Sequence, residues 1–146
     1  MTRTAALLLA LALATPAAAG AREDVDAVEA TEKACMAKAG SDPEYADCEA
    51  TAHADADAVL NAAYKVIVGE LPTNTGDASI DAENGETLRR LKAAQRAWVA
   101  FRDAECDLEG AEMLGGTGEN LMIEGCLFQL TVDRVRALAD RFDSGR

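Results

Sequence analysis

Three charged residues of this 146-residue chain stand at positions that should face its interior: Asp57, Arg102 and Arg134. Asp57 lies three residues before Leu60 and seven before Tyr64, so on a helix it would share their apolar side. Carboxylate and guanidinium groups at such positions could form ion pairs or hold a charged ligand. Spacings of three and four place the two arginines in phase with these residues: Leu91, Gln95 and Trp98 for Arg102, and Leu127, Leu130 and Leu138 for Arg134.

A buried charge without a partner is costly, so the simplest arrangement brings these side chains together. We therefore expect an Asp57–Arg102 or an Asp57–Arg134 ion pair, with Gln95 completing the hydrogen bonds. The planar guanidinium suits this role because it can hold a carboxylate at two points. The alternative is that the arginines line a cleft and receive the carboxylate of a ligand. We favour the structural interpretation, because buried charges usually pair within the protein.

The elements that would position these residues are all predicted to be helical. Hydrophobic residues make up 49% of the chain and aromatic residues only 4%, which allows a core of small side chains with few large anchors. No stretch alternates apolar and polar residues for long enough to predict a strand. We expect an all-α fold, a small disulfide-stapled bundle of three to four helices. The apolar spacing and the capping signals predict helices over 22–39, 41–70, 83–109 and 119–142, with loops at 73–81 and 110–118.

The sequence makes two further predictions about these helices. Ser41 and Glu44 form an S-x-x-E capping pattern, which predicts that the second helix begins there. The third helix is predicted to turn one apolar side toward the core, made of Leu88, Leu91, Ala94, Trp98, Phe101 and Leu108.

The first nineteen residues are predicted to be a secretory signal peptide, followed by a single domain over 20–146. Arg3 precedes an uninterrupted run of alanine and leucine from Ala5 to Ala14, and small residues then lead to a cleavage site after Ala19. The run is too short to cross about 30 Å of hydrocarbon as a helix. We therefore expect a periplasmic or secreted protein that has no membrane anchor after cleavage.

Four cysteines follow the predicted leader: Cys35, Cys48, Cys106 and Cys126. An even number of cysteines in a small exported domain indicates disulfide bonds. Three pairings are open, and we favour the local one, Cys35–Cys48 with Cys106–Cys126, because each bond would bracket a turn between two helices. A metal site is not favoured, since no C-x-x-C pattern occurs and His53 is the only histidine.

The chain carries 14 Lys and Arg against 26 Asp and Glu, a net charge of −12. This charge argues against nucleic acid and anionic membranes as partners, because phosphate binding needs clustered cations. Glu105, Glu109 and Glu112 are close enough in sequence for paired-carboxylate chemistry, but a sugar-binding cleft needs more aromatic residues than this chain has. We predict no catalytic residue, no cofactor and no metal ligand.

The segment 94–106, AQRAWVAFRDAEC, resembles the signature of lysozyme-inhibitor LprI-like domains. The segment 57–64 is similar to a second pattern of that family, D-x-x-L-N-x-x-Y, and the glycines of 115–118 are similar to its glycine loop. The stretch 126–138 is similar to its closing pattern, and the four cysteines fall where the family has them. The family-motif positions are occupied in this sequence by Asp57, Leu60, Asn61, Tyr64, Gln95, Trp98, Arg102, Asp103 and Arg134.

This resemblance covers about residues 32–138 and implies a short, stand-alone member, an exported helical domain without shared catalytic residues. Lysozyme inhibition is attributed to some members, so the implied partner is a protein, such as a cationic lysozyme or another cell-wall hydrolase that an acidic binder would attract. The alternative is an exported accessory domain that binds another envelope protein without inhibiting it. The oligomeric state is left open. An inhibitor of a cleft enzyme usually has a protruding loop, and the candidate contact residues in the two predicted loops are Asp77, Asp81, Glu112, Gly115, Gly116 and Glu119.

Overall fold

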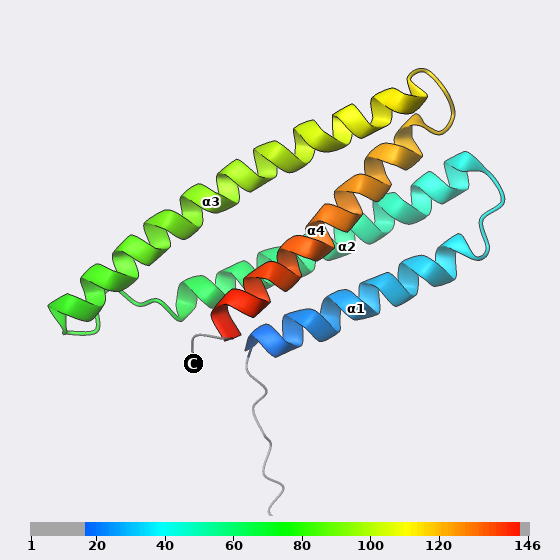
Figure 1. The fold of residues 1–146 in the computed structure, drawn as a ribbon. Helices are drawn as coiled ribbons and strands as arrows, with labels where there is room; N and C mark the ends of the chain where they lie inside the picture. Colours follow the sequence, from blue (N-terminus) through cyan, green and yellow to red (C-terminus); the bar gives the residue numbers. More distant parts are fainter. Residues whose placement is uncertain (1–16, 144–146) are drawn as a thin grey trace, which may run out of the picture.

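The fold is a bundle of four long helices, seen in a computed structural model that describes residues 17–143 (Figure 1). No strand occurs in this range, so the predicted all-α bundle is confirmed. The helices are α1 (Ala17–Met36), α2 (Asp42–Gly69), α3 (Ala78–Gly110) and α4 (Glu119–Asp143), with a 3-10 turn η1 (Ala111–Met113) after α3.

The core lies between α1, α2 and α4. Val25 of α1, Leu60 of α2 and Val132 and Val135 of α4 are almost completely buried. On α2 the buried residues from Cys48 to Ile67 are spaced by three or four, and many of them are alanines, which lets α4 pack closely against this helix. A few larger side chains, such as Phe128, fill the remaining space. The small-residue core expected from the composition is therefore present.

Helix α3 lies at the side of this core, contributes Leu91 to it and packs chiefly against α4. In Figure 1, α1 and α3 are on opposite sides of the bundle, with α2 and α4 between them. Because α3 has essentially one neighbour, only a narrow strip of its surface is covered. Phe101 is 53% exposed and Leu108 is 66% exposed. The prediction that both residues face the core is wrong, and it is wrong for Ala94, which is also exposed, whereas Leu91 of the same predicted side is buried.

The loop between α2 and α3 is shorter than predicted, because α3 begins at Ala78 instead of residue 83. Asp77 is the N-cap, and its carboxylate accepts hydrogen bonds from the backbone N–H groups of Ser79 (2.9 Å) and Ile80 (3.3 Å). The start of α2 falls where the capping pattern predicts it. However, Glu44 accepts from the Gly40 N–H at 2.8 Å, and the Ser41 hydroxyl makes no capping bond.

Two disulfide bonds join neighbouring helices, and the favoured local pairing is confirmed. Cys35 of α1 is bonded to Cys48 of α2, with their Cα atoms 5.7 Å apart. Cys106 of α3 is bonded to Cys126 of α4, with a Cα separation of 5.4 Å. The second bond fixes the end of the α3–α4 hairpin that carries the glycine-containing loop, and thereby holds the outlying helix α3 to the core.

The predicted signal peptide falls mostly outside the described residues, since only its last three positions, 17–19, belong to α1. Within the part of the chain that the structure describes, none of the helices combines the length and the apolar character that a membrane crossing requires.

Candidate functional site

The indole of Trp98 on α3 contacts two arginines from different helices. The Arg102 Cζ lies 5.2 Å from the centroid of the ring, and the Arg134 Cζ lies 5.5 Å from it. Such distances fit cation–π contacts, which strengthen when the cation is removed from water. The sequence predicts that Trp98 and Arg102 share one side of a helix and that Arg102 and Arg134 both face the interior, and the structure brings the three residues together. Trp98 itself is half-buried and packs against the edge of the core.

Arg102 is 9% exposed and joins three helices through hydrogen bonds. Its Nη1 donates to Asp57 Oδ1 on α2 at 3.2 Å and to Thr131 Oγ1 on α4 at 3.1 Å. Its Nε donates to Asp103 Oδ1 at 2.9 Å. Of the two ion pairs expected from the sequence, the structure therefore contains Asp57–Arg102. Two carboxylates and a hydroxyl compensate the desolvation of this guanidinium.

Arg134 on α4 bonds to an uncharged side chain and not to a carboxylate. Its Nε donates to the amide oxygen of Gln95 at 3.0 Å, so Gln95 serves Arg134 and does not complete the Asp57–Arg102 pair as predicted. Burial lowers the pKa of Arg134, and the neighbouring positive charge of Arg141 lowers it further. The two arginines that contact Trp98 thus differ: only Arg102 is neutralised by carboxylates of the described residues.

A groove of about 350 Å³ lies between α2 and α3 and gathers most of the family-motif residues. The Asn61 amide donates to Asp57 Oδ2 at 3.0 Å, so both carboxylate oxygens of Asp57 accept hydrogen bonds, one from Asn61 and one from Arg102. A carboxylate held in this way fixes the positions of its neighbours. The motif residues in the groove are Asp57, Leu60, Asn61, Tyr64, Gln95 and Arg102, beside Lys92, Arg96 and Val99.

The two predicted contact loops lie at opposite ends of α3. This helix has 33 residues, which corresponds to about 50 Å at 1.5 Å per residue. One binding surface of ordinary size would not include both loops. In the first loop the carboxylates are engaged internally, since Asp77 caps α3 and Asp81 Oδ1 accepts from the N–H and the hydroxyl of Thr75, both at 2.8 Å.

Hydrogen bonds at Gly115, Gly116 and Thr117 hold the second loop, 111–118, in its second half. Glu119 accepts from the Gly115 N–H at 2.7 Å, and the Thr117 hydroxyl donates to Asp42 Oδ2 of α2 at 2.7 Å. Gly115 has φ +74°, a conformation that glycine adopts most easily. Gly116 donates its N–H to the Met113 carbonyl at 2.8 Å. These contacts fix the shape of the loop and leave Glu112 exposed at its start.

An exposed surface at the C-terminal end of α3 was not anticipated from the sequence. Phe101, Glu105, Leu108 and Glu112 are spaced by four, three and four, so they lie on one side of the helix and its 3-10 extension, and all four are exposed. We call these four residues, with Leu114 of the following loop, the α3 outer face. Leu114 is 78% exposed. The alternation of large apolar and acidic residues at helical spacing was the available signal.

A group of ionisable side chains from α1, α2 and α4 lies toward the end of the bundle that carries the Cys35–Cys48 bond. Burial raises the pKa of Glu49, and the negative charges of Glu32 and Glu124 raise it further. Glu49 Oε2 is buried without a hydrogen-bond partner among the residues whose side chains the structure describes, 20–142. His53 Nδ1 lies 3.2 Å from Glu124 Oε2. Within the described chain no three such groups are arranged as metal ligands.

These features define a class of protein: a small, disulfide-bonded helical domain with an internal Asp–Arg network. The model of the family "Lysozyme inhibitor LprI" matches residues 35–138, and the chain belongs to that family. The resemblance found in the sequence motifs is thereby confirmed, and the family is one of inhibitors of an enzyme. A protein of Rhizobium meliloti (strain 1021), described as uncharacterized, is 35% identical over 143 residues, which cover 97% of each chain. No solved structure is significantly similar to this chain.

Proposed function

We propose that the protein is exported and that it binds and inhibits a cationic cell-wall hydrolase of the lysozyme type through the α3 outer face. Membership of the LprI family supports a protein partner of this kind. The observation that carries the choice of surface is the exposure of Phe101, Leu108 and Leu114, at 53%, 66% and 78%. Large apolar side chains grouped on a protein surface are typical of contact sites.

Charge complementarity specifies the partner. The chain has a net charge of −12, and exposed carboxylates stand among and beside the apolar residues of the α3 outer face: Glu105, Asp107, Glu109 and Glu112. Such a surface steers a cationic protein toward it and increases the association rate, most strongly at low salt. The apolar side chains would then supply the buried centre of the contact, and the carboxylates its rim.

The disulfides and the fastened loop support binding of a rigid partner. Cys106–Cys126 and the Glu119–Gly115 hydrogen bond hold the α3 outer face in one conformation before any partner arrives. A preorganised surface loses less conformational entropy on binding. No catalytic residue is assigned, because Arg102 binds the motif carboxylates Asp57 and Asp103, and Arg134 binds the amide of Gln95.

Export rests on the predicted leader, residues 1–19, which would leave residues 20–146 as a single mature domain. The full chain is expressed in a bacterium with two membranes, and the protein is recovered from the periplasmic fraction. Mass spectrometry of the intact protein is expected to show a chain that begins at Gly20. A protein that stays in the cytoplasm with its first nineteen residues attached would contradict export.

Inhibition is tested by the rate at which c-type and g-type lysozymes clear a suspension of bacterial cell walls, with and without the purified protein. Binding is measured in parallel by calorimetry at low and at high salt. We expect inhibition of at least one enzyme, with affinity that falls as salt rises. If neither enzyme binds at low salt, the proposal is wrong. Binding without inhibition would favour the alternative function, an accessory domain of the envelope.

Matched variants locate the contact surface. Leu108→Ser is expected to weaken binding by about tenfold or more, as loss of a central apolar contact does. Ile80→Ser is the control, because Ile80 is 47% exposed on the same helix but at its far end. Glu112→Gln is paired in the same way with Glu83→Gln, and should mainly reduce the association rate at low salt. Equal effects of Leu108→Ser and Ile80→Ser would exclude the α3 outer face.

A further inference from the structure

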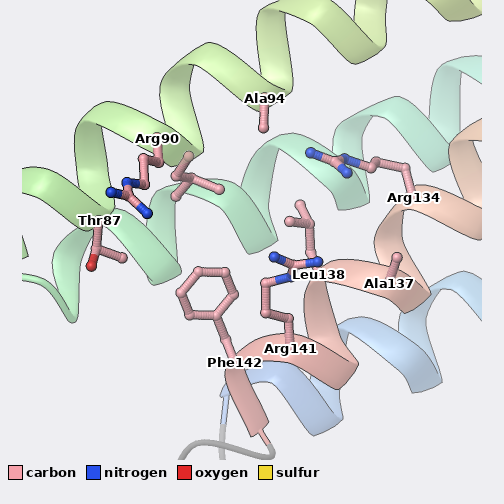
Figure 2. Close-up of a pocket in the computed structure, with 9 residues that line it drawn as sticks. Thr87, Arg90, Ala94, Arg134, Ala137, Leu138, Arg141 and Phe142 are labelled. Atoms are coloured by element: carbon pink, nitrogen blue, oxygen red, sulfur yellow. The ribbon is translucent and has the colours of Figure 1, made fainter.

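A second pocket lies between α3 and the last turns of α4, and three arginines line it. Figure 2 shows Arg90 extending from α3, Arg134 and Arg141 from α4, and the ring of Phe142 between the two helices. The cavity has a volume of about 280 Å³. This is close to the lower end of the range of small-molecule sites, about 300 Å³. The apolar part of its wall is formed by Leu91, Ala94, Ala137, Leu138 and Phe142.

The positive charge of this pocket is only partly neutralised. Arg90 donates to Glu86, but Arg89 donates to the same carboxylate, so one negative charge serves two arginines. Arg134 bonds to the uncharged Gln95, and Arg141 is exposed and makes no hydrogen bond or ion pair with the described side chains of residues 20–142. Among the described side chains that line the cavity, none is acidic.

Another arginine of α4 is fully neutralised by neighbouring carboxylates. Arg136, two residues after Arg134, donates to both carboxylate oxygens of Glu29 and to Asp26 Oδ1. Those bonds raise the pKa of Arg136, whereas burial and the charge of Arg141 lower the pKa of Arg134. Although the chain has 26 acidic residues and 14 basic ones, this pocket gathers three guanidinium groups and no described carboxylate.

We propose that this pocket binds a small organic anion, with a carboxylate or phosphate group held by Arg134 and Arg141 and a short apolar body against Leu91, Leu138 and Phe142. The Nη groups of Arg134 are available for such a contact, because its hydrogen bond to Gln95 uses Nε alone. Guanidinium groups bind both kinds of anion through paired hydrogen bonds. The apolar wall gives the site a preference for an anion with a hydrocarbon body over a bare inorganic ion. The pocket and the α3 outer face use different residues, so this site does not depend on the proposed inhibition.

The position of Trp98 provides a direct measurement. It is the only tryptophan of the chain, and its ring centroid lies 5.5 Å from the Arg134 Cζ. An anion that binds Arg134 changes the electrostatic field at the indole of Trp98, and the fluorescence of Trp98 changes with it. The purified protein is titrated separately with hexanoate, hexyl phosphate and inorganic phosphate at constant ionic strength. We expect a saturable change with hexanoate, hexyl phosphate or both, and much weaker binding of inorganic phosphate.

Charge-matched variants decide where the anion binds. Arg141→Gln removes an exposed side chain without internal bonds and is expected to weaken binding by about tenfold or more, as is Arg134→Gln. Arg96→Gln is the control, because Arg96 carries the same charge on α3 but lines the other groove. The site is overturned if none of the three anions gives a saturable change, or if Arg96→Gln weakens binding as much as Arg141→Gln. Equal affinity for hexanoate and inorganic phosphate would overturn the role of the apolar wall.

Discussion

Arg102 Nη1 lies 3.2 Å from Asp57 Oδ1, and this ion pair joins α3 to α2, two helices that otherwise contact each other little. The same guanidinium nitrogen also donates to Thr131 of α4. One residue thus ties the outlying helix to two helices of the core. The two ends of the pair are unequal, since the Arg102 side chain is 10% exposed and that of Asp57 is 43% exposed.

This inequality predicts an asymmetric response to mutation. Arg102→Met is expected to destabilise the fold by about 3 kcal/mol, because it removes a buried partner of Asp57, Asp103 and Thr131 at once. Asp57→Asn should cost only about 1 kcal/mol, since Arg102 keeps Asp103 and Thr131. Urea unfolding followed by helical circular dichroism measures both values. Similar losses in the two variants would show that the pair acts as a unit and not through the buried guanidinium.

The disulfides are expected to contribute comparably to stability. Their cysteines are separated by 13 and 20 residues, and closing loops of this length stabilises a fold by roughly 3 kcal/mol each in the chain-entropy model. Replacing Cys106 and Cys126 together by serine should lower the free energy of unfolding by about that amount. The Cys35/Cys48 double variant is the comparison. If reduction of the native protein leaves its urea midpoint unchanged, the bonds do not stabilise the fold.

The sequence was sufficient to predict the helical bundle, because apolar residues at spacings of three and four specify which side of a helix is covered. It also predicts that Asp57 forms an ion pair with one of two arginines, Arg102 or Arg134. The choice between Arg102 and Arg134 depended on where α3 and α4 cross, and no pattern within one helix contains that information. For the same reason the sequence does not show that Gln95 binds Arg134, the arginine outside the Asp57 ion pair.

The width of the covered strip is the second quantity that periodicity does not provide. Phe101 and Leu108 are in phase with the apolar side of α3, yet both are exposed, because a helix with essentially one neighbour buries only a narrow strip around Leu91, Arg102 and Cys106. The predicted start of α3, at residue 83, is too late, because Asp77 stands in a segment of polar residues that does not single it out as the N-cap.

Glu49 predicts a stability that depends on pH. Its pKa in the folded protein is raised above the ordinary value of 4.5, chiefly by burial, so folding disfavours its charged form. The stability associated with the neutral carboxyl is fully present below pH 4.5 and is lost as the pH rises through the folded-state pKa. Glu49→Gln should therefore raise the Tm at pH 7, and the difference from the native protein should vanish well below pH 4.5.

The control for this experiment removes the same charge from a different place. Glu83 is exposed on α3, so Glu83→Gln reduces the net charge of −12 by one unit without changing the surroundings of Glu49. A Tm increase of equal size in both variants would attribute the effect to general charge repulsion. An increase confined to Glu49→Gln, and present only at neutral pH, confirms local desolvation.

Two glycines should respond to alanine in opposite directions. Gly69 ends α2, and an added Cβ would meet nothing within 4 Å, so Gly69→Ala should stabilise by about 0.5–1 kcal/mol through lower entropy of the unfolded chain. Gly115 has φ +74°, and alanine there should cost about 1 kcal/mol or more because its Cβ crowds the backbone. Thermal unfolding compares them. Gly115→Ala should also weaken partner binding, because this glycine donates its N–H to Glu119 and shapes the loop that carries Leu114.

Unchanged stability of Gly115→Ala would mean that the loop readily adopts another conformation. The proposal that the α3 outer face is preorganised would then be wrong.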